Sequence, residues 1–190
     1  MYVIIRRGGA PERTEAMAEE EWFDVVNEAD EVIGRAPRRR CHGDPSLIHR
    51  TAHVAVTPPG GGALLLQLRA RTKDIQPGKW DTAVGGHLRP GEDYEAAARR
   101  EMNEELGLPA SAPLVFCFDD RIRNQVESEN VRVFRTEAAG PFDFQREEID
   151  DVRFWSMAEI ASELAAGGEA FTPNLRRELA LLRAAGIITF

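Results

Sequence analysis

Long hydrophobic runs are absent from this sequence. No segment approaches the roughly 20 apolar residues that a membrane-spanning helix needs, and the apolar residues from Tyr2 to Ile5 are too few for a signal peptide. The chain has only two cysteines, Cys41 and Cys117, which lie far apart, so a disulfide framework is not expected. These absences favour a cytoplasmic protein without a membrane anchor.

Basic charge is scarce as well. The chain has 24 Lys and Arg against 32 Asp and Glu, a formal net charge of -8, which leaves no basic excess for a nucleic acid polymer. One strongly basic run, Arg38 to Arg40, reads as a solvated turn or, alternatively, as a phosphate clamp. A length of 190 residues, 43% of them hydrophobic, fits one compact domain with a sizeable core. We expect a polar lead-in over residues 1–20 and a single domain over residues 21–190.

Strand and helix patterns alternate along the rest of the chain. Strands are predicted over residues 23–27, 31–34, 49–56, 63–68, 114–118, 131–135 and 152–155. The Pro-Pro-Gly-Gly-Gly turn at residues 58–62 predicts a hairpin between the third and fourth of these strands. Helices are predicted over residues 157–166 and 174–185, with Gly186 ending the second. With one more helix at the centre of the chain, this order predicts an α/β sandwich with a mixed sheet.

That central helix lies in residues 86–108, which carry the densest chemical signal. Pro90-Gly91 is a turn, the three alanines at 96–98 favour a helix, and Gly107 stands where a helix commonly ends. Glu101, Glu104 and Glu105 are spaced i, i+3 and i+4 and share one helix face. Like charges at this spacing destabilise a helix by roughly 0.2–0.5 kcal/mol per pair. A hard cation such as Mg²⁺ or Mn²⁺ would remove the conflict; a solvated acidic face is the alternative.

The spacing within this segment resembles the Nudix box at every defined position: Gly86, Glu92, Arg100-Glu101, Glu104-Glu105 and Gly107. The resemblance implies an α/β/α sandwich with a mixed central sheet. It also implies that Glu101, Glu104 and Glu105 hold Mg²⁺ or Mn²⁺, and that Gly86 lets backbone approach the metal. Arg100 would orient a carboxylate, Glu92 would brace the loop–helix junction, and Gly107 would end the helix.

The same resemblance implies hydrolysis of a small diphosphate, either a nucleoside diphosphate linked to another moiety or a related compound. The metal ions would bridge diphosphate oxygens and offset charge as it develops. A carboxylate would take the proton of the attacking water. The sequence leaves four candidates for this base: Glu104, Glu105, Glu129 and Glu148.

A narrower resemblance covers residues outside the box. Residues 42–50, 77–87, 126–130 and 170–173 resemble isopentenyl-diphosphate isomerases, a specialised branch of the Nudix fold. In that branch three histidines and a Glu-x-Glu pair bind one divalent metal, and the matching positions here are His42, His49, His87, Glu127 and Glu129. Three imidazoles with two carboxylates suit Mn²⁺, Zn²⁺ or Fe²⁺ better than Mg²⁺. His53 matches nothing in this pattern.

The isomerase resemblance breaks at Gly85. Isomerisation needs a proton donor on one face of the carbon skeleton and an acceptor on the other, and Gly85 stands where the isomerases carry a cysteine for this transfer. Cys117 lies on a different predicted strand and reads as a buried structural thiol, which leaves Glu129 without an opposite partner. Hydrolysis is therefore favoured. An isomerase and a non-catalytic nucleotide- or diphosphate-binding module are the alternatives.

Basic and aromatic side chains near the box are candidates for substrate binding. Four basic residues would meet outer phosphates, although each alone also reads as a surface charge: Arg69, Arg71, Lys73 and Lys79. Trp80 and the Phe154-Trp155 pair would stack on a base, cover an isoprenoid tail or pack in the core. No motif defines the oligomeric state, and the fold is compatible with a homodimer.

Overall fold

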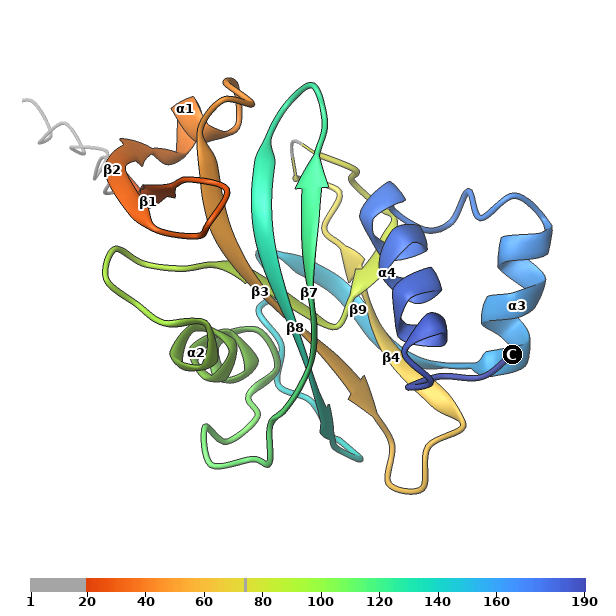
Figure 1. The fold of residues 1–190 in the computed structure, drawn as a ribbon. Helices are drawn as coiled ribbons and strands as arrows, with labels where there is room; N and C mark the ends of the chain where they lie inside the picture. The colour runs from red at the N-terminus through yellow and green to blue at the C-terminus, as the bar shows by residue number, and fades with distance from the viewer. Residues whose placement is uncertain (1–19, 74) are drawn as a thin grey trace, which may run out of the picture.

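The computed structural model describes residues 20–73 and 75–190, so nearly all of the expected lead-in lies outside the described residues. The elements follow one another in the order drawn in Figure 1: β1 (Trp22–Val26), β2 (Val32–Pro37), α1 (Arg38–Cys41), β3 (Ile48–Thr57), β4 (Ala63–Arg69), β5 (Trp80–Thr82), β6 (Val84–His87), α2 (Tyr94–Leu106), β7 (Val115–Arg123), β8 (Ser128–Glu137), β9 (Ile149–Ser156), α3 (Met157–Ala165) and α4 (Pro173–Ala184). None of these helices is long and apolar enough to cross a membrane.

The strands form two sheets between helices. The larger sheet has the order β2-β1-β3-β8-β7, with β6 also paired to β3, and the smaller sheet has the order β5-β4-β9. Because β3 runs parallel to β8 and antiparallel to β6, the larger sheet is mixed. In Figure 1, α2 lies on one side of the strands and α3 and α4 lie on the other. The predicted α/β/α sandwich with a mixed central sheet is therefore confirmed.

Strand β3 contributes to both cores because successive side chains point to opposite faces. Ala52, Val54 and Val56 pack with the buried face of α2, whereas Ala55 packs with residues of α4. The odd-numbered polar residues of β3 share the face of Ala55. The alternation thus turns His49 and His53 towards the same face of the larger sheet as Ala55, and His53 meets α4 there.

Local sequence signals set the ends of the helices. The side chain of Asp93 accepts a hydrogen bond from the backbone N–H of Ala96 at 2.9 Å, which caps α2. Gly107 ends α2 in the left-handed region at φ 67°, a conformation that favours glycine. In α4, Thr172 caps the helix and Pro173 occupies its first turn. These caps fix where the glutamates of α2 and α4 lie along each helix.

The predicted hairpin between residues 49–56 and 63–68 is wrong. β4 pairs with β5 and β9 in the smaller sheet. Both edges of β3 are taken by other strands, since β8 lies along one edge and β6 and β1 lie along the other. Two short strands, β5 and β6, were not predicted, because a segment rich in glycine gives no strand pattern.

Smaller corrections concern single residues and strand ends. Arg38 to Arg40 lie in the one-turn helix α1 and not in a turn. Cys117 is half-buried and not buried, while Cys41 is fully buried. Both thiols are free, as expected. Strands β7, β8 and β9 extend past the predicted ranges at one or both ends, because pairing with neighbouring strands continues where the local pattern stops.

Candidate metal and diphosphate site

The Arg100 guanidinium organises the carboxylates at the start and middle of α2. It donates to both carboxylate oxygens of Glu92, with Nε at 2.9 Å and Nη2 at 2.7 Å. Its Nη1 donates to Glu101 at 2.6 Å and to Glu104 at 3.1 Å, and its Nη2 also donates to the carbonyl oxygen of His87 at 3.1 Å. Bidentate charge-assisted bonds of this kind fix geometry as well as charge. One guanidinium therefore ties the box loop, the helix and β6 together.

Gly86 allows Glu101 to lie directly against β6. A Cβ built on Gly86 would overlap the carboxyl group of Glu101. Glu101 is mostly buried, and burial raises the pKa of its carboxyl group even though Arg100 opposes the change. A carboxylate held against backbone in this way is a suitable ligand for a hard cation.

Glu105 lies deeper than the other two carboxylates of this group. Its carboxylate accepts hydrogen bonds from the Gln67 side chain at 3.4 Å and from the backbone N–H of Gly85 at 3.2 Å. Burial, followed by the charge of Glu101, raises the pKa of Glu105 well above its usual value. Glu104 is more exposed and also pairs with Arg89 at 3.1 Å. Divalent cation binding would offset the charge that burial concentrates at Glu101 and Glu105.

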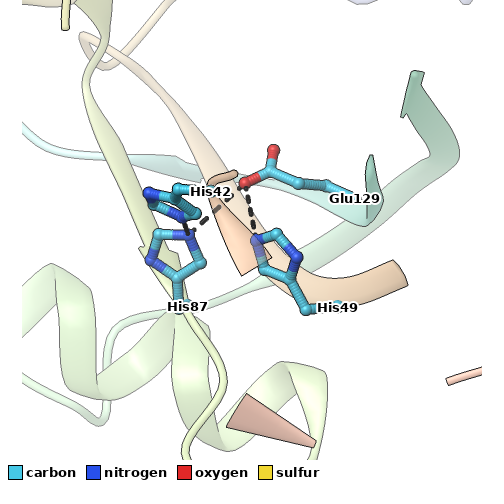
Figure 2. A group of neighbouring side chains, drawn as sticks. All are labelled: His42, His49, His87 and Glu129. Atoms are coloured by element: carbon cyan, nitrogen blue, oxygen red, sulfur yellow. Dashed lines mark hydrogen bonds and ion pairs between the residues drawn. The ribbon is translucent and has the colours of Figure 1, made fainter. Parts of the chain in front are cut away.

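A second cluster lies on the opposite face of β6. Figure 2 shows His42, His49, His87 and Glu129 converging, and one ligand atom from each lies within 4.8 Å of the others. The Glu129 carboxylate lies 3.4 Å from Nε2 of both His49 and His87. Glu127, the fifth residue expected here, lies at the edge of the cluster with Oε2 4.0 Å from Nε2 of His42.

The protonation chemistry of this cluster suits a metal. Burial, then the neighbouring His87 and Arg38, lower the pKa of His42 to about 4, and burial also lowers the pKa of His87. Although burial opposes it, the neighbouring imidazoles of His49 and His87 lower the pKa of Glu129. His42 and His87 are thus neutral imidazoles beside an ionised carboxylate, the forms that bind metal ions.

Two further observations within the cluster also favour a bound metal ion. Nε2 of His49 is buried without a hydrogen-bond partner among the described residues, although buried polar atoms are normally satisfied. Nε2 of His42 and Nε2 of His87 face each other at 3.1 Å. These residues fit a divalent cation with nitrogen and oxygen ligands, such as Mn²⁺, Zn²⁺ or Fe²⁺.

Phe23 of β1 forms an apolar support for the imidazoles. Its ring stacks on His87 with centroids 4.4 Å apart and on His49 with centroids 5.1 Å apart. Arg38, from the basic run, donates to Glu21 at 2.8 Å and lies 3.4 Å from Nδ1 of His87. Sequence reasoning missed Phe23 because nothing in its local pattern separates it from an ordinary core residue.

The expected substrate-binding residues are not gathered at one place. Lys73 pairs with Glu148 at 2.8 Å, and both contribute to the electrostatic surroundings of Glu105. By contrast, Arg69 pairs with Asp81 at 3.2 Å and Lys79 lies 3.8 Å from Glu169. Arg71 is exposed. Lys73 is thus the member of this set that the structure brings near the box, together with Glu148, one of the candidate bases.

The aromatic candidates take part in packing. Trp80 meets Trp155 edge-on with centroids 5.4 Å apart. Trp155 is buried in the core beside α4, and Phe154 packs from the other side against the core beside α2. This arrangement matches the core-packing alternative for the three rings.

His53, which sequence reasoning set aside, is part of a buried polar network. Its Nδ1 lies 2.6 Å from Oε2 of Glu178 on α4, and Thr82 donates to Oε1 of the same carboxylate at 2.8 Å. Although burial lowers the pKa of His53, the charge of Glu178 raises it to about 9. Strand alternation gives a signal for this residue, because His49 and His53 are four positions apart along β3 and so share one face.

The fold and the site together combine carboxylates on one helix with an arginine that orders them. A family model described as the NUDIX domain matches residues 47–175. The chain therefore belongs to the Nudix hydrolase family, whose members act on pyrophosphate bonds.

Individual relatives agree with this assignment. The chain is 37% identical over 169 residues to the uncharacterized Nudix hydrolase YfcD of Escherichia coli, covering 87% of this chain and 88% of that protein. It is also 32% identical over 166 residues to the isopentenyl-diphosphate Delta-isomerase of Nocardia farcinica, covering 85% of this chain and 94% of that protein. The crystal structure of DR0079 from Deinococcus radiodurans superimposes with a TM-score of 0.72 at 25% identity, covering 86% of this chain and 98% of that one.

Proposed function

We propose that this protein is a metal-dependent pyrophosphohydrolase that cleaves a nucleoside diphosphate linked to another moiety, or a related small diphosphate. One observation carries the proposal. Arg100 holds Glu92, Glu101 and Glu104 in a single hydrogen-bonded group, and Gly86 leaves room for the Glu101 carboxyl group against β6. A non-catalytic binding module has no need for so complete an arrangement of carboxylates.

Glu101, Glu104 and Glu105 would hold Mg²⁺ or Mn²⁺. When bound, such an ion offsets the negative charge of the diphosphate and of the breaking P–O bond. The protein's own contribution is to keep the three carboxylates in place through Arg100 and through the backbone N–H of Gly85. Water attacks phosphorus, and a carboxylate takes its proton; Glu104, Glu105, Glu129 and Glu148 are the candidates. Lys73, paired with Glu148, is placed to meet an outer phosphate.

The test is release of phosphate or pyrophosphate from a panel of compounds in Mg²⁺ and in Mn²⁺. The panel contains nucleoside di- and triphosphates, nucleotide sugars, dinucleotides, coenzyme A and isopentenyl diphosphate. Glu104→Gln is expected to lower the rate by about 10²-fold or more, because it removes a charged ligand. Glu95→Gln is the matched control, since Glu95 lies on the same helix and, within residues 20–73 and 75–190, pairs only with Arg99. Equal rates for Glu104→Gln and Glu95→Gln would sink the proposal.

A second candidate function is isomerisation of a carbon–carbon double bond in isopentenyl diphosphate. The convergence of His42, His49, His87 and Glu129 favours it, together with the similarity to the isomerase of Nocardia farcinica. Gly85 speaks against it, because position 85 has no group that transfers a proton. Appearance of dimethylallyl diphosphate, with no hydrolysis of any panel member, would make this candidate the better one.

A further inference from the structure

His53 occupies the space that a side chain at position 85 would need. The two residues face each other across β3 and β6. A Cβ built on Gly85 would lie 3.3 Å from Cδ2 and 3.4 Å from Nε2 of His53, and 3.3 Å from the methyl group of Thr82. The imidazole therefore lies over β6 because residue 85 is glycine, and it supplies the polar group at this point of the sheet.

Glu178 fixes the orientation of this imidazole. One oxygen of the Glu178 carboxylate lies against Nδ1 of His53, and the other accepts a hydrogen bond from the hydroxyl of Thr82. The bond to Nδ1 turns Nε2 away from α4 and towards Gly85. Glu178 is the single hydrogen-bond partner of the ring within residues 20–73 and 75–190. A histidine oriented by a carboxylate, with its second nitrogen left for another molecule, is a recurring arrangement in binding and catalysis.

The imidazole lies beside the hydrolytic site. The backbone N–H of Gly85 donates to Glu105 of the box, and His87, two residues further along β6, belongs to the imidazole cluster. The side chain of His53 keeps 13% of its surface exposed, and Gly85 is also partly exposed. The edge of the ring is thus partly open to solvent beside the Gly85 backbone, and a substrate held at the box would extend past Gly85 to reach it.

We propose that His53, held by Glu178, forms a donor subsite that binds an acceptor oxygen of the moiety linked to the diphosphate. The inference rests on the proposed hydrolase function and adds the chemistry of the second half of the substrate. The raised pKa of His53 keeps Nε2 protonated at neutral pH, so the ring offers an N–H donor and cannot act as an acceptor. The moiety therefore carries a hydroxyl, carbonyl or carboxylate oxygen at this position, and a purely apolar tail leaves the donor unpaired.

The experiment compares two compounds that differ only in the linked moiety. ADP-ribose carries hydroxyl oxygens there, whereas ADP esterified with n-pentanol carries none. UDP-glucuronate and UDP-glucose form a second pair, which separates an anionic acceptor from a neutral one. The measured quantity is the ratio of kcat/KM values within each pair, because a ratio is insensitive to a general loss of folded protein.

The main variant replaces both His53 and Glu178 by leucine. Removing both partners avoids an unpaired buried charge, and apolar replacement of a buried ion pair is often neutral for stability. His53→Gln is a second variant that keeps a neutral donor, and Arg176→Gln on α4 is the control. The wild type is expected to prefer ADP-ribose over the pentyl ester by roughly tenfold or more, and the double variant is expected to lose that preference. His53→Gln should retain part of it.

Failure of this inference can be told apart from failure of the hydrolase function. If Glu104→Gln hydrolyses as fast as the wild type, the assignment of hydrolysis to the box fails, and calorimetric Kd ratios for the same compound pairs then decide the subsite. If Glu104→Gln is inactive but the double variant keeps the wild-type preference, the subsite is wrong. The absence of any preference in the wild type, in rate and in Kd, also overturns it.

Discussion

The two faces of β6 hold clusters of potential metal ligands with opposite physical character. On the face towards α2, the ligands are carboxylates, and one guanidinium binds two of them. On the face towards α4, three imidazoles surround one buried carboxylate, Glu129, beneath the ring of Phe23. A strand of four residues serves both because Gly86 faces one way while Gly85 and His87 face the other.

The two sets of ligands differ in how burial changes their pKa values. Burial raises the pKa values of Glu101 and Glu105, so these carboxylates gain most from a cation that offsets their charge. Burial lowers the pKa values of His42 and His87, so these imidazoles are neutral ligands before any metal arrives. Carboxylate oxygens suit Mg²⁺ or Mn²⁺, and imidazole nitrogens suit Mn²⁺, Zn²⁺ or Fe²⁺. We therefore expect the two faces of this strand to prefer different metal ions.

We expect the largest difference in hydrolysis rate when one methyl group is added to each face of β6 in turn. Gly86→Ala would drive a Cβ into the Glu101 carboxyl group, so hydrolysis should fall by about 10²-fold or more. Gly85→Ala would place its Cβ 3.3 Å from the ring of His53 and from the methyl group of Thr82, a contact relieved by a shift of a few tenths of an ångström, so hydrolysis should fall by less than about tenfold. Steady-state rates on one substrate measure both. Equal losses would show that the two faces are not separate.

Alkaline and acid unfolding distinguish two imidazoles on the α4 face. The charge of Glu178, against the effect of burial, raises the pKa of His53 from 6.5 to about 9. His53 thus contributes stability below pH 6.5 that is lost as the pH rises through about 9, on the order of 3 kcal/mol. Burial lowers the pKa of His42 to about 4, so metal-free protein should lose stability as the pH falls from 6.5 towards 4.

Urea unfolding midpoints across this pH range, in the presence of a chelator, test both signs. His53→Gln should remove the alkaline decline and leave the acid decline in place. His42→Gln should do the reverse. A wild-type stability that is flat between about pH 7 and pH 10 would contradict the charged pair of His53 with Glu178.

Stabilisation by Zn²⁺ should also differ between variants of the two faces of β6. Zn²⁺ at about 100 times its Kd should stabilise the wild type by about 2.7 kcal/mol. His49→Gln should lose most of this stabilisation, because its Nε2 is the buried nitrogen without a partner. Glu104→Gln should keep it. Melting temperatures with Zn²⁺, with Mg²⁺ and with a chelator provide the measurement, and loss of the Zn²⁺ effect in Glu104→Gln alone would assign that metal to the box.

The smallest expected effect concerns the apolar support of the imidazoles. Phe23→Leu keeps an apolar residue but removes the ring that stacks on His49 and His87. We expect a loss of about 1–2 kcal/mol of stability from the stacking and the volume, together with weaker Zn²⁺ binding and little change in hydrolysis. Chemical unfolding measures the loss of stability, and Zn²⁺ titration measures the loss of binding. A larger loss of hydrolysis than of Zn²⁺ affinity would contradict the separation of the faces.

Sequence reasoning worked where the information is local. The cap at Asp93, the alanine-rich turns and Gly107 define α2, so its glutamates were placed before any tertiary contact was known. It failed where partners come from distant segments. The hairpin of β3 and β4 was wrong because strand pairing depends on which edges other strands occupy. The role of His53 was missed because its partner, Glu178, lies 125 residues away on α4.

The most direct test of this account is the rate of hydrolysis of one diphosphate, in Mg²⁺, by two variants that each disable one face of β6. Glu104→Gln alters the α2 face and His49→Gln alters the α4 face. Glu104→Gln is expected to lose about 10²-fold or more of the rate, while His49→Gln should stay within about tenfold of the wild type. A hydrolysis rate that survives Glu104→Gln but falls by about 10²-fold in His49→Gln would place the reaction at the imidazole cluster and contradict the account.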